Sequence, residues 1–74
     1  MPKLPILPAK KLVKVFQKAG YFFVRQTGSH IRMCHKNRNS ITIPNHKTVG
    51  PGLLNKILRD ADMSGDDFLK LIKK

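Results

Sequence analysis

Apolar residues between positions 9 and 20 recur with the spacing of an α-helix. They fall at i, i+3, i+4 and i+7, which places them on one side of a helix and leaves the lysines of this segment on the other side. Pro8 suits the first turn of a helix, and Gly20 is a common residue just after a helix end. The segment therefore predicts a helix with an apolar stripe and a basic outer face. The stripe is Leu12, Val15, Phe16 and Ala19, and the lysines are Lys10, Lys11, Lys14 and Lys18.

The pattern changes from helical to alternating after Gly20. Residues 21–26 are rich in β-forming side chains, and Thr27-Gly28-Ser29 is a typical turn sequence. Residues 30–35 alternate between apolar and polar, and a polar turn at 36–39 leads to a short strand at 40–44. These segments predict a three-stranded antiparallel meander. Its expected inward residues are Ile31, Met33, Ile41 and Ile43, and its expected outward residues are Tyr21, Arg25, His30, Arg32 and Cys34.

The C-terminal part of the chain predicts two further helices after a loop at 45–51. The first starts at about Gly52, and the second runs from Gly65 to about Lys73. Ser64 is expected to cap the second helix, with Asp67 completing a capping box and Met63 and Phe68 a hydrophobic staple. The expected buried residues are Leu53, Leu54, Ile57, Leu58 and Ala61 in the first helix, and Phe68, Leu69 and Ile72 in the second.

Together these elements predict an α+β fold of order α-β-β-β-α-α, with one three-stranded antiparallel sheet packed on helices. The chain has 74 residues, which is the size of one small domain covering residues 1–74. Residues 1–7 contain Pro2 and Pro5 and are expected to form an extended arm. At this size any chemistry takes place on the surface or in a shallow groove.

Positive charge dominates the sequence, which has 15 Lys and Arg, 4 Asp and Glu and a formal net charge of +11. All four acidic residues lie at or after Asp60, so the first 59 residues carry no acid. An uncompensated positive field of this kind attracts polyanions. The charge distribution therefore favours a nucleic-acid partner.

The same composition argues against several other classes of protein. Magnesium and calcium sites need carboxylate oxygens, and the four clustered aspartates suit helix caps and first turns better. The single cysteine, Cys34, allows neither an internal disulfide nor a zinc ribbon. No apolar run approaches the ~20 residues needed to span a bilayer, and residues 1–8 lack the apolar stretch of a signal peptide. We expect a cytoplasmic protein without metal, cofactor or membrane association.

Three histidines are the groups able to exchange protons near neutral pH. His35 ends a strand on its apolar side and is expected to be half-buried, and His46 is either a ligand-contacting residue or a turn residue. His30 follows a tight turn and shares the outward face with Arg32. Neighbouring cations favour the neutral imidazole that a general base requires, and they could hold a phosphate. On these grounds alone, His30 is either a catalytic base or a phosphate-contacting residue without catalysis.

Five segments occur in a characteristic order along the chain. They are Phe16-Gln17-Lys18-Ala19-Gly20-Tyr21, Arg25-Gln26-Thr27-Gly28-Ser29-His30, Ile43-Pro44-Asn45-His46, Gly52-Leu53-Leu54-Asn55-Lys56-Ile57-Leu58-Arg59-Asp60-Ala61, and Met63-Ser64 followed by Asp67-Phe68. In this order they resemble the HicA family of toxins. The resemblance covers about residues 9 to 72, and the ordered combination is specific although each piece is short. The chain departs from the pattern at Asp62, where glycine is usual, and in a slightly short 46–52 loop.

The resemblance implies a fold similar to double-stranded-RNA-binding domains and the function of a messenger-RNA endonuclease in a toxin–antitoxin pair. It implies that His30 is catalytic, that Gly28 and Ser29 position it, and that His46 matches a second family histidine. It also implies a HicB-like antitoxin that covers the active surface, and a heterotetramer is one assembly that such a pair can form. The expected RNA-binding residues are Lys10, Lys11, Lys14, Lys18, Arg25, Arg32 and Lys47.

A metal-free mechanism fits these residues, because RNA supplies its own nucleophile, the 2′-OH. His30 would take the 2′-OH proton, and His46 is the candidate acid for the leaving 5′-oxygen. Two alternatives remain open at this point. A non-catalytic double-stranded-RNA-binding module would use the same basic surface, whereas a DNA-binding regulator is disfavoured because no helix-turn-helix precedes the strands.

Overall fold

The computed structural model describes residues 3–73 and has the predicted order of helices and strands. The elements are α1 (Ala9–Lys18), β1 (Phe22–Thr27), β2 (His30–Cys34), β3 (Ile41–Pro44), α2 (Pro51–Asp60) and α3 (Gly65–Ile72). The α+β prediction with a three-stranded antiparallel sheet is therefore confirmed. Met1 and Pro2, which belong to the predicted N-terminal arm, lie outside the described residues, as does Lys74.

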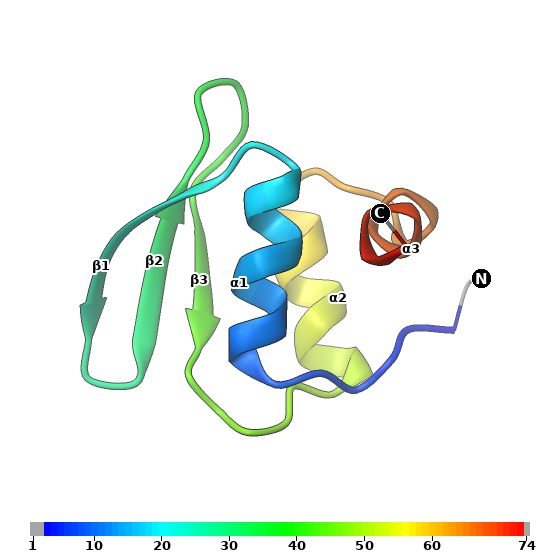
Figure 1. The fold of residues 1–74 in the computed structure, drawn as a ribbon, viewed down its shortest axis with the longest axis horizontal. Helices are drawn as coiled ribbons and strands as arrows, with labels where there is room; N and C mark the ends of the chain where they lie inside the picture. Colours follow the sequence, from blue (N-terminus) through cyan, green and yellow to red (C-terminus); the bar gives the residue numbers. More distant parts are fainter. Residues whose placement is uncertain (1–2, 74) are drawn as a thin grey trace.

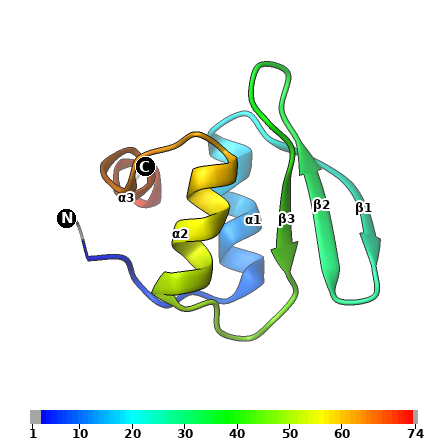
Figure 2. The same cartoon turned by 180° about the vertical axis from the view of Figure 1, so that it is seen from behind.

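The sheet has the order β1-β2-β3, and both neighbouring pairs are antiparallel. All three helices lie on one side of it, with α1 and α2 beside β3 and β1 at the far edge (Figures 1 and 2). Every residue of β1 is exposed as a result, including Phe22, Phe23 and Val24. Within residues 3–73, no helix lies on the other face of the sheet.

A β-bulge interrupts the pairing of β1 with β2 between Phe23 and Arg25. Phe23 pairs with Met33 and Arg25 pairs with Arg32, so Val24 is an extra residue without a partner. Because side chains alternate along a strand, one extra residue reverses the face of everything beyond it. The bulge therefore brings Arg25 to the face that carries Arg32, opposite to the helices.

The core lies between the inner face of the sheet and the helices. All four residues predicted to point inward from β2 and β3 are at most 7% exposed. The two largest fully buried side chains, Phe16 of α1 and Phe68 of α3, have ring centroids 5.9 Å apart. The prediction for Leu53 was wrong, because this side chain lies on the outer side of α2 and is 38% exposed. Leu69 is half-buried and Leu71, not Leu69, packs with Ile72 against the core.

Helices α1 and α2 end in the same hydrogen-bonded motif. After α1, Tyr21 N–H donates to the Phe16 carbonyl at 3.0 Å, and Gly20 has a φ of 101°. After α2, Met63 N–H donates to the Leu58 carbonyl at 2.9 Å, and Asp62 has a φ of 56°. A left-handed residue at this place closes a helix and is usually glycine. The departure at Asp62 is therefore local, since Asp occupies a glycine-type position.

Hydrogen bonds also fix the start of α3 and the N-terminal segment. Ser64 Oγ accepts a hydrogen bond from Asp67 N–H at 3.0 Å, which confirms the predicted N-cap of α3. Leu7 and Val49 form an antiparallel bridge, and Ala9 N–H donates to the His46 carbonyl at 3.0 Å. The described part of the N-terminal segment is thus tied to the loop between β3 and α2, and its Leu4 is buried.

Candidate functional site

The turn between β1 and β2 sets the position of His30. Thr27 pairs with His30, which leaves Gly28 and Ser29 as a two-residue loop. Gly28 has a φ of 59°, as the first residue of a two-residue hairpin turn often requires, and a Cβ there would meet no atom within 4 Å. The requirement for glycine is therefore conformational and not one of space.

Two hydrogen bonds to the backbone carbonyls of this turn hold it in place. Gln26 Nε2 donates to the Gly28 carbonyl at 3.0 Å, and Asn45 N–H donates to the Ser29 carbonyl at 2.6 Å. The second bond ties the turn to the residue just after β3. His30 thus starts β2 from a turn that is held by both neighbouring segments.

His30 lies in an open hollow on the outer face of the sheet. The hollow is lined by Arg25, Thr27, His30, Arg32 and Thr42, which come from all three strands. Arg32 Nη1 donates to Thr42 Oγ1 at 2.9 Å, so one arginine of the hollow is anchored. No carboxylate is among the lining residues, so the hollow presents one imidazole, two guanidinium groups and two hydroxyls to solvent.

The structure places Arg25 on this face, as expected, but the prediction for Tyr21 was wrong. Simple alternation put both residues on the outward side, whereas the bulge at Val24 separates them. Tyr21 is 3% exposed and its ring packs edge-on against Phe16 at 5.5 Å. Its hydroxyl donates to the Asn39 carbonyl at 2.7 Å, and burial raises the pKa of the phenol. Tyr21 is part of the core and does not contribute to the hollow.

His35 is a structural residue. Its Nδ1 accepts from Asn37 N–H and its Nε2 faces the Ala19 carbonyl, both at 2.9 Å. Since a carbonyl can only accept, Nε2 must carry the proton, and both ring nitrogens are occupied. The ring also contacts Tyr21 at a centroid distance of 4.9 Å. This half-buried histidine joins the end of α1 to the β2–β3 hairpin through both of its ring nitrogens.

His46 and Lys47 are exposed in the loop after β3, at the same end of the sheet as His30. His30 pairs with Pro44, and the Asn45–Ser29 hydrogen bond keeps the loop against the turn. Neither His46 nor Lys47 lines the hollow itself. They lie beside the site without forming its floor.

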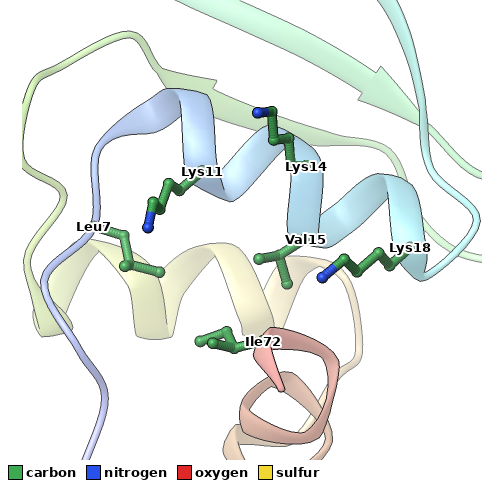
Figure 3. A pocket seen from close by; sticks show the side chains of 6 residues that line it. All are labelled: Leu7, Lys11, Lys14, Val15, Lys18 and Ile72. Atoms are coloured by element: carbon green, nitrogen blue, oxygen red, sulfur yellow. The ribbon is translucent and has the colours of Figure 1, made fainter. Parts of the chain in front are cut away.

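The four lysines of α1 are exposed, but they occupy the helical side of the molecule. Lys10 and Lys14 line a groove between α1 and the inner side of the β1–β2 hairpin, together with Phe23 and Ile31. Lys11, Lys14 and Lys18 line a second pocket together with Leu7, Val15 and Ile72 (Figure 3). Lys18 Nζ also donates to the Leu71 carbonyl at 3.4 Å. Apart from Lys47 in the loop after β3, the predicted RNA-binding residues therefore fall into two groups, one on each side of the sheet.

Sequence reasoning missed Thr27 and Thr42 as members of the hollow. Thr42 lies between the inward Ile41 and Ile43, so period-two alternation already places it outward. What the sequence did not provide was the register that puts it opposite Arg32. Thr27 was assigned to the turn, and it instead forms the last pair of β1 with His30.

No group of three or more His, Cys, Asp or Glu side chains is placed to hold a metal ion among the described residues. In the same part of the chain, no helix is long and apolar enough to cross a membrane.

Comparison with known protein families matches residues 9–63 to the family described as "HicA toxin of bacterial toxin-antitoxin". The chain belongs to the HicA toxin family. The match runs from the first residue of α1 to just beyond α2, so it includes the complete sheet and the turn that carries His30. Membership in the HicA family identifies a toxin of the toxin–antitoxin type, which works with an antitoxin partner. Searches of curated proteins and of solved structures found no match.

Proposed function

We propose that this HicA-family toxin is a metal-independent endoribonuclease that cleaves messenger RNA with His30 as general base. The observation that carries the proposal is the setting of His30, an exposed imidazole in a hollow that it shares with Arg25 and Arg32. A proton acceptor beside two permanent cations suits a reaction in which a proton leaves and negative charge grows on a phosphate.

The reaction begins when His30 accepts the proton of an RNA 2′-OH. The 2′-oxygen forms a bond to the adjacent phosphorus while the bond from phosphorus to the 5′-oxygen breaks. An acid protonates the leaving 5′-oxygen, which gives a 2′,3′-cyclic phosphate and a 5′-hydroxyl. His46 is our candidate for this acid, because it is exposed next to the turn that carries His30. Gly28 and Ser29 position the base, and Arg32 or Lys47 stabilises the phosphate.

The basic surface supports RNA as the substrate. The lysines of α1, which are Lys10, Lys11, Lys14 and Lys18, would contact backbone phosphates away from the cleaved bond. Contacts to roughly 6–10 phosphates would make affinity fall by orders of magnitude between low and moderate salt. The partner that fits this proposal is a HicB-like antitoxin that covers the hollow in the cytoplasm, and a heterotetramer is one assembly that such a pair can form.

The second candidate is a double-stranded-RNA-binding module without catalysis. The observation in its favour is that the α1 lysines lie away from the His30 hollow, as a binder that reads RNA by shape would allow. Such a module has no need for a histidine on a fixed turn. Cleavage therefore separates the two candidates.

Replacing His30 is the direct test. General-base removal typically lowers a rate by about 10²–10⁴-fold, so His30→Ala should lose toxicity on induction and RNA cleavage in vitro. Lys36→Ala is the matched control, because Lys36 is exposed on the hairpin at the opposite end of the sheet. The control should remain toxic, and both variants should keep the far-ultraviolet circular dichroism of the wild type. Equal toxicity of wild type and His30→Ala would refute the assignment.

A further inference from the structure

We infer that Arg25 and Arg32 together bind one phosphate group beside His30, and that Thr42 is the positioning residue that holds Arg32 for this contact. The inference rests on the proposed function for the identity of the natural ligand, a phosphodiester of RNA. The proposed function left open whether Arg32 or Lys47 stabilises the reacting phosphate. The inference assigns this role to Arg25 and Arg32.

The first reason is the placement of two like charges. Arg25 and Arg32 are direct partners across β1 and β2, and both line the hollow. Like charges directly opposite each other destabilise a strand pair. No acidic residue lines the hollow to compensate them. A bound phosphate between the two guanidinium groups would replace this repulsion with charge-assisted hydrogen bonds, which are among the strongest in proteins.

The second reason is the bulge at Val24. If residues 23–25 alternated regularly, without the bulge, Arg25 would point to the same side as Phe23, which is the helical side of the sheet. Bulges re-aim side chains near functional sites at the expense of ladder pairing. Here the bulge gains no burial, because Val24 is 43% exposed. Its structural effect is to bring Arg25 opposite Arg32 on the face of His30.

The third reason is the anchor on Arg32. Thr42 Oγ1 accepts from Arg32 Nη1 at 2.9 Å, which fixes the guanidinium with one of its five donors. The donors that remain form a planar fork of the shape that binds two phosphate oxygens. Donors that are already oriented need no rearrangement when charge develops on the ligand. Thr42 therefore acts through Arg32 and is not itself a catalytic residue.

The spacing along the strands suits a reaction at His30. The Arg25–Arg32 pair and the Thr27–His30 pair are two positions apart on the same face. Two residues of a strand span about 6–7 Å, which an arginine side chain can cover. A phosphate held by the arginines would lie next to the His30 imidazole.

Titration with inorganic phosphate, followed by NMR at constant ionic strength, tests the site without any RNA. Arg25→Gln and Arg32→Gln should each weaken phosphate binding by roughly tenfold, since each removes a charged donor. Arg59→Gln removes the same charge from the exposed side of α2 and should leave binding unchanged. Thr42→Val should weaken binding by roughly threefold or more, and Thr42→Ser should restore it because the hydroxyl is retained. Phosphate that instead shifts the α1 lysine resonances, or that binds all variants equally, would overturn the inference.

RNA cleavage by the same variants separates this inference from the proposed function. If the arginine variants lose phosphate binding but the wild type cleaves no RNA, the phosphate site stands and the ribonuclease proposal falls. If the wild type cleaves RNA through His30 and both arginine variants cleave as fast, the phosphate site is wrong and the ribonuclease proposal stands.

Discussion

The inner and outer faces of β2 differ in what covers them. On the inner face, Met33 is fully buried and Ile31 is 7% exposed, and both pack in the single core with the helices. On the outer face, His30 is exposed and Arg32 is half-buried, and the Arg32 guanidinium donates a hydrogen bond to the Thr42 hydroxyl. The inner side chains pack against other side chains of the core, whereas the outer side chains are accessible to a ligand.

This difference shows how a chain of 74 residues can combine a fold and a site in the same strand. Because the two faces alternate residue by residue, the inner side chains can be selected for packing and the outer ones for chemistry. The separation depends on the register, since a slip by one residue would exchange the two faces. The turn at Gly28 and the bulge at Val24 are the features that set this register.

Truncation of Met33, which is buried on the inner face, should have the largest effect on the free energy of unfolding. Met33→Ala leaves a cavity in the core and should cost about 2–5 kcal/mol of unfolding free energy. His30→Ala, three residues away on the outer face, should change the stability by no more than about 0.5 kcal/mol. Chemical denaturation of both variants measures this contrast. A destabilisation by His30→Ala as large as that of Met33→Ala would mean that the outer face also supports the fold.

Substitution of Gly28 should have the next largest effect, because it strains the turn that sets the register. Gly28→Ala forces a Cβ into a left-handed conformation and should cost about 1–2 kcal/mol. Gly52→Ala, on α2, is the matched control, since its Cβ also meets nothing within 4 Å but its backbone is helical. This control should stabilise the protein by up to about 1 kcal/mol. Thermal melts of the pair check the prediction, and equal shifts in the same direction would contradict it.

Removal of the Tyr21 hydroxyl should give the smallest effect and tests whether this residue belongs to the inner side. Tyr21→Phe deletes the 2.7 Å hydrogen bond to the Asn39 carbonyl while leaving the ring in place. The expected loss is about 0.5–1.5 kcal/mol of stability, with no loss of RNA cleavage. Denaturation and cleavage assays on the same preparation measure both quantities. Unchanged stability with impaired cleavage would instead mean that the Tyr21 hydroxyl acts in the site and not in the core.

The elements and their order could be predicted from the sequence because each segment has a clear hydrophobic period and recognisable ends. The inward positions of Ile31, Met33, Ile41 and Ile43 followed from alternation alone. Tyr21 could not be placed correctly, because a bulge has no signal in the pattern of β-forming residues. Leu53 was misplaced for a related reason, since the burial of a residue at the rim of a helix stripe depends on how far the neighbouring elements extend.

The candidate site could be predicted in part. The turn signal at Gly28-Ser29 and the alternation after it placed His30 and Arg32 on one face. The resemblance to the HicA family, which the family match confirms, added the catalytic role that remains a proposal. Thr42 and the pairing of Arg25 with Arg32 depend on strand register, which short sequence patterns do not encode. The division of the basic residues between two sides of the sheet also required the three-dimensional arrangement.

The chemistry of the cleaved ends tests the central claim most directly. Mass spectrometry of an RNA oligonucleotide incubated with the protein and excess chelator should find a 2′,3′-cyclic phosphate, or its hydrolysis product, upstream of a 5′-hydroxyl. DNA of the same sequence, and RNA whose 2′-OH groups are methylated, should bind and remain uncut, because the nucleophile belongs to the substrate. Products with 5′-phosphate ends that form only with Mg²⁺ would contradict the account and remove His30 from the role of general base.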